Sequence, residues 1–170
     1  TSLDGKIATS IGASKWITGE ISRAIGQGMR ARSDAIMIGG RTAIADNPSL
    51  TCRLPGLGDA SPNRIVICGS EPIPLTHSLV VSAAKVPTIF FTGKKCALAN
   101  CEKYEAAGIS VIEVGADSNG DVDIRAALFS LGEQGITRLM VEGGGRIISA
   151  FMSADLVDYL VWFRAPKVIG

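Results

Sequence analysis

Residues 139–148 read Leu139-Met-Val-Glu142-Gly-Gly-Gly145-Arg-Ile-Ile148. The apolar run predicts a buried strand that ends at Val141, and the run from Arg146 predicts the start of a helix. Glycines have no Cβ, so the backbone between strand and helix can turn sharply and approach a ligand closely. The first N–H groups of a helix favour a phosphate. A tight connection without a ligand is the plainer alternative, and the stretch alone favours phosphate only slightly.

The rest of the chain alternates apolar runs with helical patterns at short spacing. Strands are expected at residues 6–9, 34–38, 64–68, 88–91, 109–114, 139–141 and 157–163, and helices near 19–32, 41–45, 97–107, 124–135 and 146–153. This order predicts an α/β fold with three layers, in which helices cover both faces of a mostly parallel sheet. Because no repeat or long linker divides the chain, we expect a single domain over residues 1–170.

The helix expected over residues 19–32 has a regular apolar pattern, with Thr18 as its expected N-cap. A buried stripe is predicted for Ile21, Ala24, Ile25, Gly28 and Met29. The other side is predicted to carry Arg23, Gln27 and Arg30. Arg30 would then lie on a solvated helix face.

The composition excludes several classes of function. A net charge of +1 gives no reason to expect nucleic acid or an anionic membrane as partner. No apolar run reaches the length of a membrane span. Four cysteines without a C-x-x-C pair, and one histidine, make a zinc site unexpected. A hydrophobic content of 46% and a mean hydropathy of +0.30 fit either a heavily buried sheet or a surface covered by another chain or domain. A homodimer is the expected oligomer.

Three segments rich in small residues follow predicted strands, at 39–46, 69–70 and 142–146. Carboxyl ends of parallel strands share one edge of a sheet, where ligands of open α/β folds bind. The spacing is not G-x-G-x-x-G, so the ordinary dinucleotide fingerprint is absent. Without a catalytic serine or cysteine triad or a P-loop, a bound cofactor is expected to supply the difficult chemistry.

A second group of residues suits a phosphorylated ligand, because arginine binds phosphate through two donors. It comprises Ser14, Lys15, Trp16, Arg30 and Arg53. Each has a plainer alternative: Arg30 a solvated position, Trp16 a core or lid aromatic. Asp46 is either a turn residue before Asn47-Pro48 or a carboxylate that handles a proton. Glu142 either binds a ligand amine or hydroxyl, or caps the turn.

Five motifs in order resemble a known family. They are Ser2-Leu-Asp-Gly-Lys-Ile-Ala-Thr9, Ser14-Lys-Trp-Ile-Thr18, Ala45-Asp-Asn-Pro-Ser-Leu-Thr-Cys-Arg53, Val141-Glu-Gly-Gly-Gly145 and Ala165-Pro-Lys-Val-Ile-Gly170. Together they are similar to the reductase domain of the bacterial riboflavin-biosynthesis pyrimidine deaminase/reductase. The resemblance implies a dihydrofolate-reductase-like fold. It also implies NADPH-dependent reduction of 5-amino-6-(5-phosphoribosylamino)uracil to the ribityl compound.

The resemblance also assigns residues. Substrate contacts are implied for Ser14, Arg30, Leu50, Arg53 and Glu142. Cofactor contacts are implied for Trp16, Thr42, Asp46, Gly69, Gly144, Gly145, Arg146, Ile147, Ile148, Ser149 and Ala150. Position 69 is glycine here, so it offers no side chain to the cofactor.

The family resemblance further implies a domain that begins before Thr1 and continues past Gly170, so the chain is expected to be a fragment. A zinc deaminase domain, if present, would precede it. The segment at Thr1 does not resemble a signal peptide, and a cytoplasmic location is expected.

The expected mechanism passes a hydride from the nicotinamide to C1′ of a ring-opened ribose. Arg30, Arg53 and Ser14 would hold the 5-phosphate, Glu142 would orient the substrate, and Asp46 would relay a proton. Selection of NADPH over NADH would fall to Ser70, Lys94 or Lys95. Three alternatives stay open: dihydrofolate reduction, reduction of a 2,5-diamino-pyrimidinone, and a nucleotide-binding module without turnover.

Overall fold

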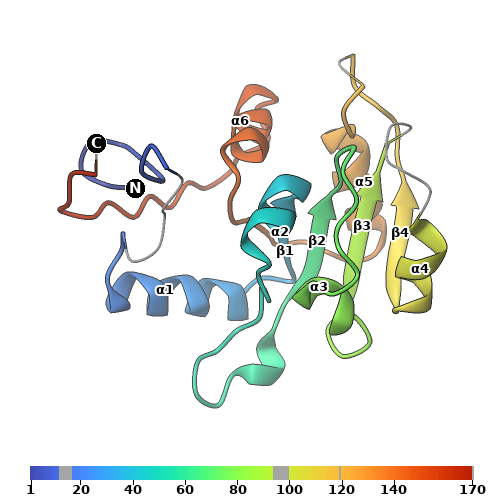
Figure 1. Ribbon diagram of the computed structural model, residues 1–170, viewed down its shortest axis with the longest axis horizontal. Coiled ribbons are helices and arrows are strands. Elements are labelled where there is room, and N and C mark those ends of the chain that lie inside the picture. Colours follow the sequence, from blue (N-terminus) through green and yellow to red (C-terminus); the bar gives the residue numbers. More distant parts are fainter. Residues whose placement is uncertain (12–16, 94–99, 119, 170) are drawn as a thin grey trace.

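The computed structural model describes residues 1–11, 17–93, 100–118 and 120–169. Within these residues, five parallel strands form one sheet in the order β4-β3-β2-β1-β5 (Figure 1). The strands are β1 (Ala35–Gly39), β2 (Asn63–Ile67), β3 (Thr88–Thr92), β4 (Ile109–Glu113) and β5 (Leu139–Val141). The register places Met37 of β1 beside Ile65 on one side and Val141 on the other.

Helices cover both faces of this sheet. They are α1 (Glu20–Ala31), α2 (Gly40–Asp46), α3 (Ser78–Val81), α4 (Cys101–Ala106), α5 (Ile124–Glu133) and α6 (Gly145–Ser153), with a 3-10 turn η1 (Gly58–Ala60). Side chains alternate between the faces of a strand. Ile36 and Ile38 therefore pack on the side of α2, α3 and α4, whereas Ala35 and Met37 pack on the side of α5 and α6. The three-layer α/β fold expected from the sequence is confirmed.

Two expected strands are absent from the described residues. Residues 7 and 8 form a bend instead of a strand, and a turn precedes them in which the Ser2 N–H donates to the Lys6 carbonyl at 2.9 Å around Gly5. At 157–163 the chain is extended but has no ladder partner along its length. Instead the two terminal segments contact each other: the Thr1 ammonium donates to the Phe163 carbonyl at 2.6 Å, and the Leu3 N–H to the Lys167 carbonyl at 2.7 Å.

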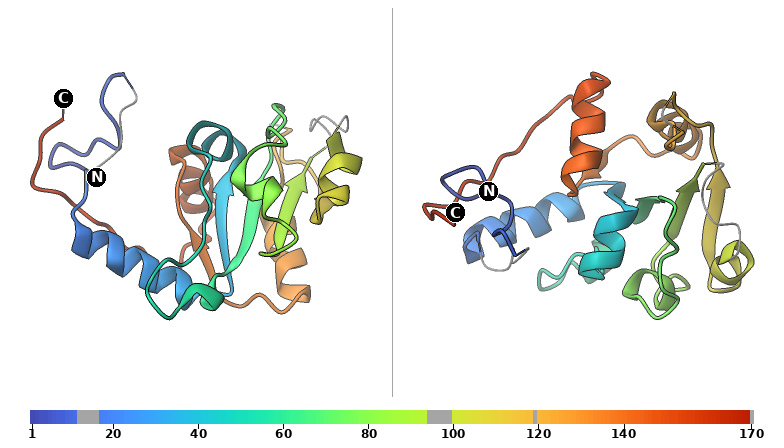
Figure 2. Two further views of the ribbon diagram at one scale, coloured as in Figure 1. Left: turned by 60° about the horizontal axis from the view of Figure 1, so that its bottom comes forward. Right: turned by 45° about the horizontal axis from the view of Figure 1, so that its top comes forward.

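The predicted buried stripe of α1 is wrong. Ile21 is 79% exposed and Ile25 is 46% exposed, whereas Arg30 is buried. The reason is the position of the helix: α1 begins beside the terminal segments, and only its last turn reaches the body of the protein (Figure 2). Gly19, rather than Thr18, is the N-cap, and it makes no side-chain cap hydrogen bond.

Candidate active site at the carboxyl edge of the sheet

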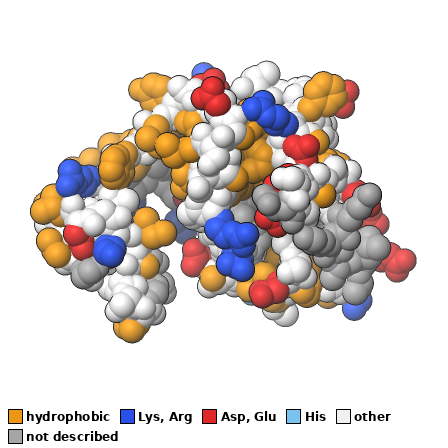
Figure 3. Space-filling model, turned by 90° about the horizontal axis from the view of Figure 1, so that it is seen from above, with side chains coloured by type: hydrophobic (Ala, Val, Ile, Leu, Met, Phe, Trp, Pro, Cys, Tyr) orange, Lys and Arg blue, Asp and Glu red, His pale blue; other side chains and the backbone are white. Residues whose placement is uncertain are grey.

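The three small-residue segments meet at one edge of the sheet, as the sequence predicted. They follow β1, β2 and β5, which run parallel. Gly40 lets the backbone after β1 pack closely against the backbone after β2, because a Cβ there would lie 3.1 Å from the Gly69 nitrogen and 3.3 Å from the Ile67 oxygen. Figure 3 looks down on this edge and shows a hollow between the body and the lobe formed by the terminal segments.

The glycine turn after β5 contacts α2. Gly143 and Gly144 have positive φ angles of 129° and 83°, a conformation that residues with a side chain rarely adopt. A Cβ on Gly144 would lie 2.7 Å from the Oγ1 of Thr42. The structure thus brings together two residues that the family resemblance assigns to the cofactor. The N-terminus of α6, nine residues long and without a side-chain cap, opens at the same turn.

The first residues of α6 differ in what they offer to a ligand. Ile147 is 6% exposed and packs in the core with Phe151, so it can present only its backbone. The others are exposed: Gly145, Arg146, Ile148, Ser149 and Ala150. Bare N–H groups and a helix dipole at this end are suited to a pyrophosphate. The turn therefore fits a dinucleotide cofactor.

Glu142 and Arg30 form the central ion pair of the site. The Arg30 Nε donates to Oε2 of Glu142 at 2.7 Å, and its Nη2 donates to Oε1. The Arg30 Nη1 donates to the Thr51 carbonyl at 3.0 Å. Such two-point, charge-assisted contacts are strong and directional. The solvated position that the helix pattern indicated for Arg30 is wrong, because the tertiary contact with Glu142 buries it.

The remaining predicted site residues differ in their exposure and in whether the structure describes them. Arg53 and Asp46 are exposed, the latter at the end of α2. Leu50 is 3% exposed and has a positive φ of 54°, so its side chain is in the core and only its backbone faces a ligand. Five candidate residues lie outside the described part of the chain: Ser14, Lys15, Trp16, Lys94 and Lys95.

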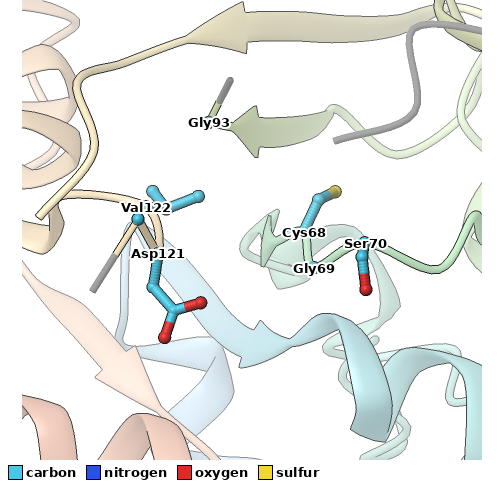
Figure 4. A pocket seen from close by; sticks show the side chains of 7 residues that line it. Cys68, Gly69, Ser70, Gly93, Asp121 and Val122 are labelled. Carbon is cyan, nitrogen blue, oxygen red and sulfur yellow. The ribbon is translucent and has the colours of Figure 1, made fainter. Parts of the chain in front are cut away.

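A cavity of about 220 Å³ lies beyond the ends of β2 and β3 (Figure 4). Its lining includes Gly69, Ser70 and Asp121. The Asp121 carboxylate pairs with Arg146 of α6 at 3.6 Å. Both groups are well exposed, so this ion pair is weak. Ligand pockets usually exceed about 300 Å³, so this cavity suits one part of an extended ligand.

Sequence reasoning missed Arg64. This residue lies in the central strand β2 and is fully buried. Its guanidinium donates to Thr88 Oγ1 at 2.7 Å, Ser82 Oγ at 2.8 Å and the Ser49 carbonyl at 3.3 Å, among others. Burial lowers the pKa of Arg64 to about 10, so it stays charged at neutral pH. The signal was a single charge at the start of the apolar run 64–68.

Two further findings concern the described part of the chain. No group of three or more histidine, cysteine, aspartate or glutamate side chains there is placed to hold a metal ion. None of its helices is both long and apolar enough to cross a bilayer.

The fold defines an α/β domain of the dihydrofolate-reductase-like class, with a candidate ligand site at the carboxyl edge of its sheet. The chain belongs to the family described as RibD C-terminal domain, whose model matches residues 1–170.

Relatives agree with this membership. The riboflavin biosynthesis protein RibD of Chlamydia trachomatis serovar D is 37% identical over 99% of the chain, which spans 44% of that protein. The 2,5-diamino-6-ribosylamino-4(3H)-pyrimidinone 5′-phosphate reductase of Aquifex aeolicus is 34% identical, and the match covers 99% of the chain and 75% of that protein. The solved structure of Acinetobacter baumannii RibD, form 1, superposes with a TM-score of 0.81 at 27% identity, covering 99% of this chain and 45% of that one.

Proposed function

We propose that this chain reduces 5-amino-6-(5-phosphoribosylamino)uracil to 5-amino-6-(5-phosphoribitylamino)uracil with NADPH, in riboflavin biosynthesis. The observation that carries the proposal is the Arg30–Glu142 pair with its bond to Thr51. It joins the end of β5, the end of α1 and the loop that carries Arg53. The glycine turn proposed to bind the cofactor and the loop proposed to bind the phosphate are therefore linked through the Arg30–Glu142 pair.

The cofactor and the substrate bind to different parts of the site. Gly143, Gly144 and the start of α6 hold the pyrophosphate of NADPH, while the cavity by Gly69 and Ser70 takes the adenosine end. NADPH, when bound, supplies the electron pair and hydrogen of the reduction. This assignment rests on the bare turn at Gly144, where any side chain would meet Thr42.

The substrate side positions the reacting carbon. Arg53 binds the 5-phosphate, and Ser14 adds a hydrogen bond. Arg30, which was also expected to hold the phosphate, is assigned to Glu142 instead, because its guanidinium donates to that carboxylate and to the Thr51 carbonyl. Glu142, held by Arg30, orients the opened ribose so that C1′ faces the cofactor side. Remote phosphate binding of this kind converts binding energy into rate. Asp46, exposed at the end of α2, relays the balancing proton to the ring oxygen or to a water.

A 2,5-diamino-pyrimidinone is the second candidate substrate. It is favoured by the Aquifex aeolicus relative, of which this chain matches 75%. Both candidates share the phosphoribosylamino group, so both fit the same loop. We further propose that the natural protein is a cytoplasmic homodimer in which a zinc deaminase domain precedes this one, as the RibD relatives of about twice its length suggest.

The direct test compares three compounds with the full-length natural protein. Loss of NADPH absorbance is followed with the phosphoribosylaminouracil, with its 2,5-diamino-pyrimidinone counterpart and with dihydrofolate. We expect the highest kcat/KM for the uracil. A preference for dihydrofolate would overturn the proposal, and NADPH binding without turnover of any compound would show a binding module.

A further inference from the structure

The loop from Ser49 to Arg53 is held by side chains rather than by secondary structure. Each of its backbone bonds comes from a different direction: Arg64 Nη1 to the Ser49 carbonyl at 3.3 Å, Arg30 Nη1 to the Thr51 carbonyl at 3.0 Å, the Cys52 N–H to Ser61 Oγ at 3.1 Å and the Arg53 N–H to Gln27 Oε1 at 2.8 Å. Contacts at four of the five residues of the loop hold its backbone in one conformation.

That shape is not the one the loop would adopt alone. Leu50 has a positive φ of 54° and a side chain that is 3% exposed. A non-glycine residue in the left-handed region is strained, and such strain persists only where the surroundings fix it. The hydrogen bonds on either side of Leu50 provide this constraint.

Gln27 holds the end of the loop that bears the exposed guanidinium. It lies one turn before Arg30 on α1, and residues three apart share a helix face. Its side-chain oxygen accepts from the Arg53 N–H, and its backbone carbonyl lies 3.6 Å from Cys52 Sγ. The chain after Arg53 is exposed at Pro55 and Gly56, so these residues do not take over the role of Gln27 in holding the Arg53 backbone.

We propose that Gln27 is a positioning residue for substrate phosphate: by fixing the backbone of Arg53, it aims the Arg53 guanidinium at a phosphate monoester. This inference rests on the proposed function. Gln27 itself touches neither substrate nor cofactor. The side chain of Gln27 acts through Arg53, because the contact with Cys52 is made by the Gln27 backbone carbonyl, which a substitution keeps. The other backbone contacts of the loop belong to Arg30, Arg64 and Ser61.

The test uses Gln27→Met in the full-length natural protein, since methionine keeps the length of the side chain and removes the acceptor. We expect KM for the phosphorylated substrate to rise about tenfold, the equivalent of one lost hydrogen bond. The kcat and the KM for NADPH should stay within about twofold, and so should the KM for the dephosphorylated riboside. The matched control is Gln134→Met on α5, where Gln134 bonds to Ser130 of its own helix.

The double variant Gln27→Met/Arg53→Ala decides whether the effect passes through Arg53. Coupled residues show non-additive effects, so the double variant should match Arg53→Ala. Additive losses, an equal rise in KM for the riboside, or an unchanged KM for the phosphorylated substrate would each overturn the inference while leaving the proposed function standing. If the unaltered protein turns over neither phosphorylated pyrimidine, the proposed function fails and the role of Gln27 fails with it.

Discussion

At the scale of single residues, Glu142 is the group on which both halves of the site converge. Its backbone N–H donates to the Met37 carbonyl at 3.0 Å, which extends the β1–β5 pairing, and its carboxylate receives two donors from Arg30. The sequence placed Glu142 at a strand end beside glycines. It could not show the partner, because Arg30 is 112 positions away.

Replacing this carboxylate tests its role directly. Glu142→Gln keeps the shape and loses the charge-assisted contact with Arg30. We expect kcat/KM for the phosphorylated pyrimidine to fall by about 10–100-fold, as for a charged hydrogen bond of about 1.5–3 kcal/mol, while the Kd for NADPH is unchanged. Glu133→Gln, at an exposed position on α5, is the control. A variant with full activity would remove Glu142 from the substrate site.

Gly144 offers a second test at this scale. In Gly144→Ala the new Cβ would meet Thr42 Oγ1 at 2.7 Å, at a φ of 83°. We expect a loss of about 1–3 kcal/mol in the free energy of unfolding and weaker NADPH binding.

The unfolding control is Gly145→Ala, since a Cβ there has nothing within 4 Å. Adding Thr42→Ala should restore the part of the loss that comes from the close contact, leaving the backbone strain. Equal unfolding free energies for the two alanine variants would contradict the close packing of the turn against α2.

At the scale of elements, the strands were predictable and the faces of α1 were not. Buried parallel strands are continuous apolar runs, so β1, β2 and β3 stand out in the sequence. The apolar positions of α1 have the spacing of a buried stripe, but Ile21 and Ile25 remain exposed. A helical period shows that one face is apolar, not which surface covers it. The strand expected at 157–163 failed for a related reason, because a strand requires a partner.

Asp34 links the starts of β1 and β5 and gives the stability a pH dependence. Its carboxylate accepts from the Thr137 N–H, the Thr137 hydroxyl and the Arg138 N–H. The backbone bonds from Thr137 and Arg138 lower the pKa of Asp34 below its usual 3.8. The stabilisation is therefore complete well above pH 4 and is lost as the pH falls through the lowered pKa.

The measurement is urea unfolding of the unaltered protein and of Asp34→Ala across this range. We expect Asp34→Ala to be less stable at pH 7, and the difference between the two proteins to shrink below about pH 4 as the carboxyl is protonated. A difference that stays constant with pH would show that the charge of Asp34 contributes nothing.

At the scale of the whole molecule, the three segments that meet at the edge of the sheet were predictable, and the conformation of the loop beside them was not. Parallel strands bring residues 39–46, 69–70 and 142–146 together by topology alone. The loop that carries Leu50 and Arg53 follows no period, and it is fixed by Arg64, Arg30 and Gln27 from distant parts of the chain. Long-range hydrogen bonds of this kind leave no local pattern. The arginine chemistry of Arg53 and the family resemblance marked the loop in the sequence, but neither showed what holds it in place.

The most direct test of the account is the effect of Arg53→Ala on two substrates in the full-length natural protein. The KM for the phosphoribosylaminouracil and the KM for its dephosphorylated riboside are measured at the same NADPH concentration. The Kd for NADPH is measured as well. We expect the KM for the phosphorylated compound to rise about 100-fold or more, since an arginine–phosphate contact is charge-assisted. The KM for the riboside and the NADPH affinity should scarcely change. Equal losses on both substrates, or a fall in NADPH affinity instead, would contradict the division of the site into a phosphate-binding loop and a cofactor turn.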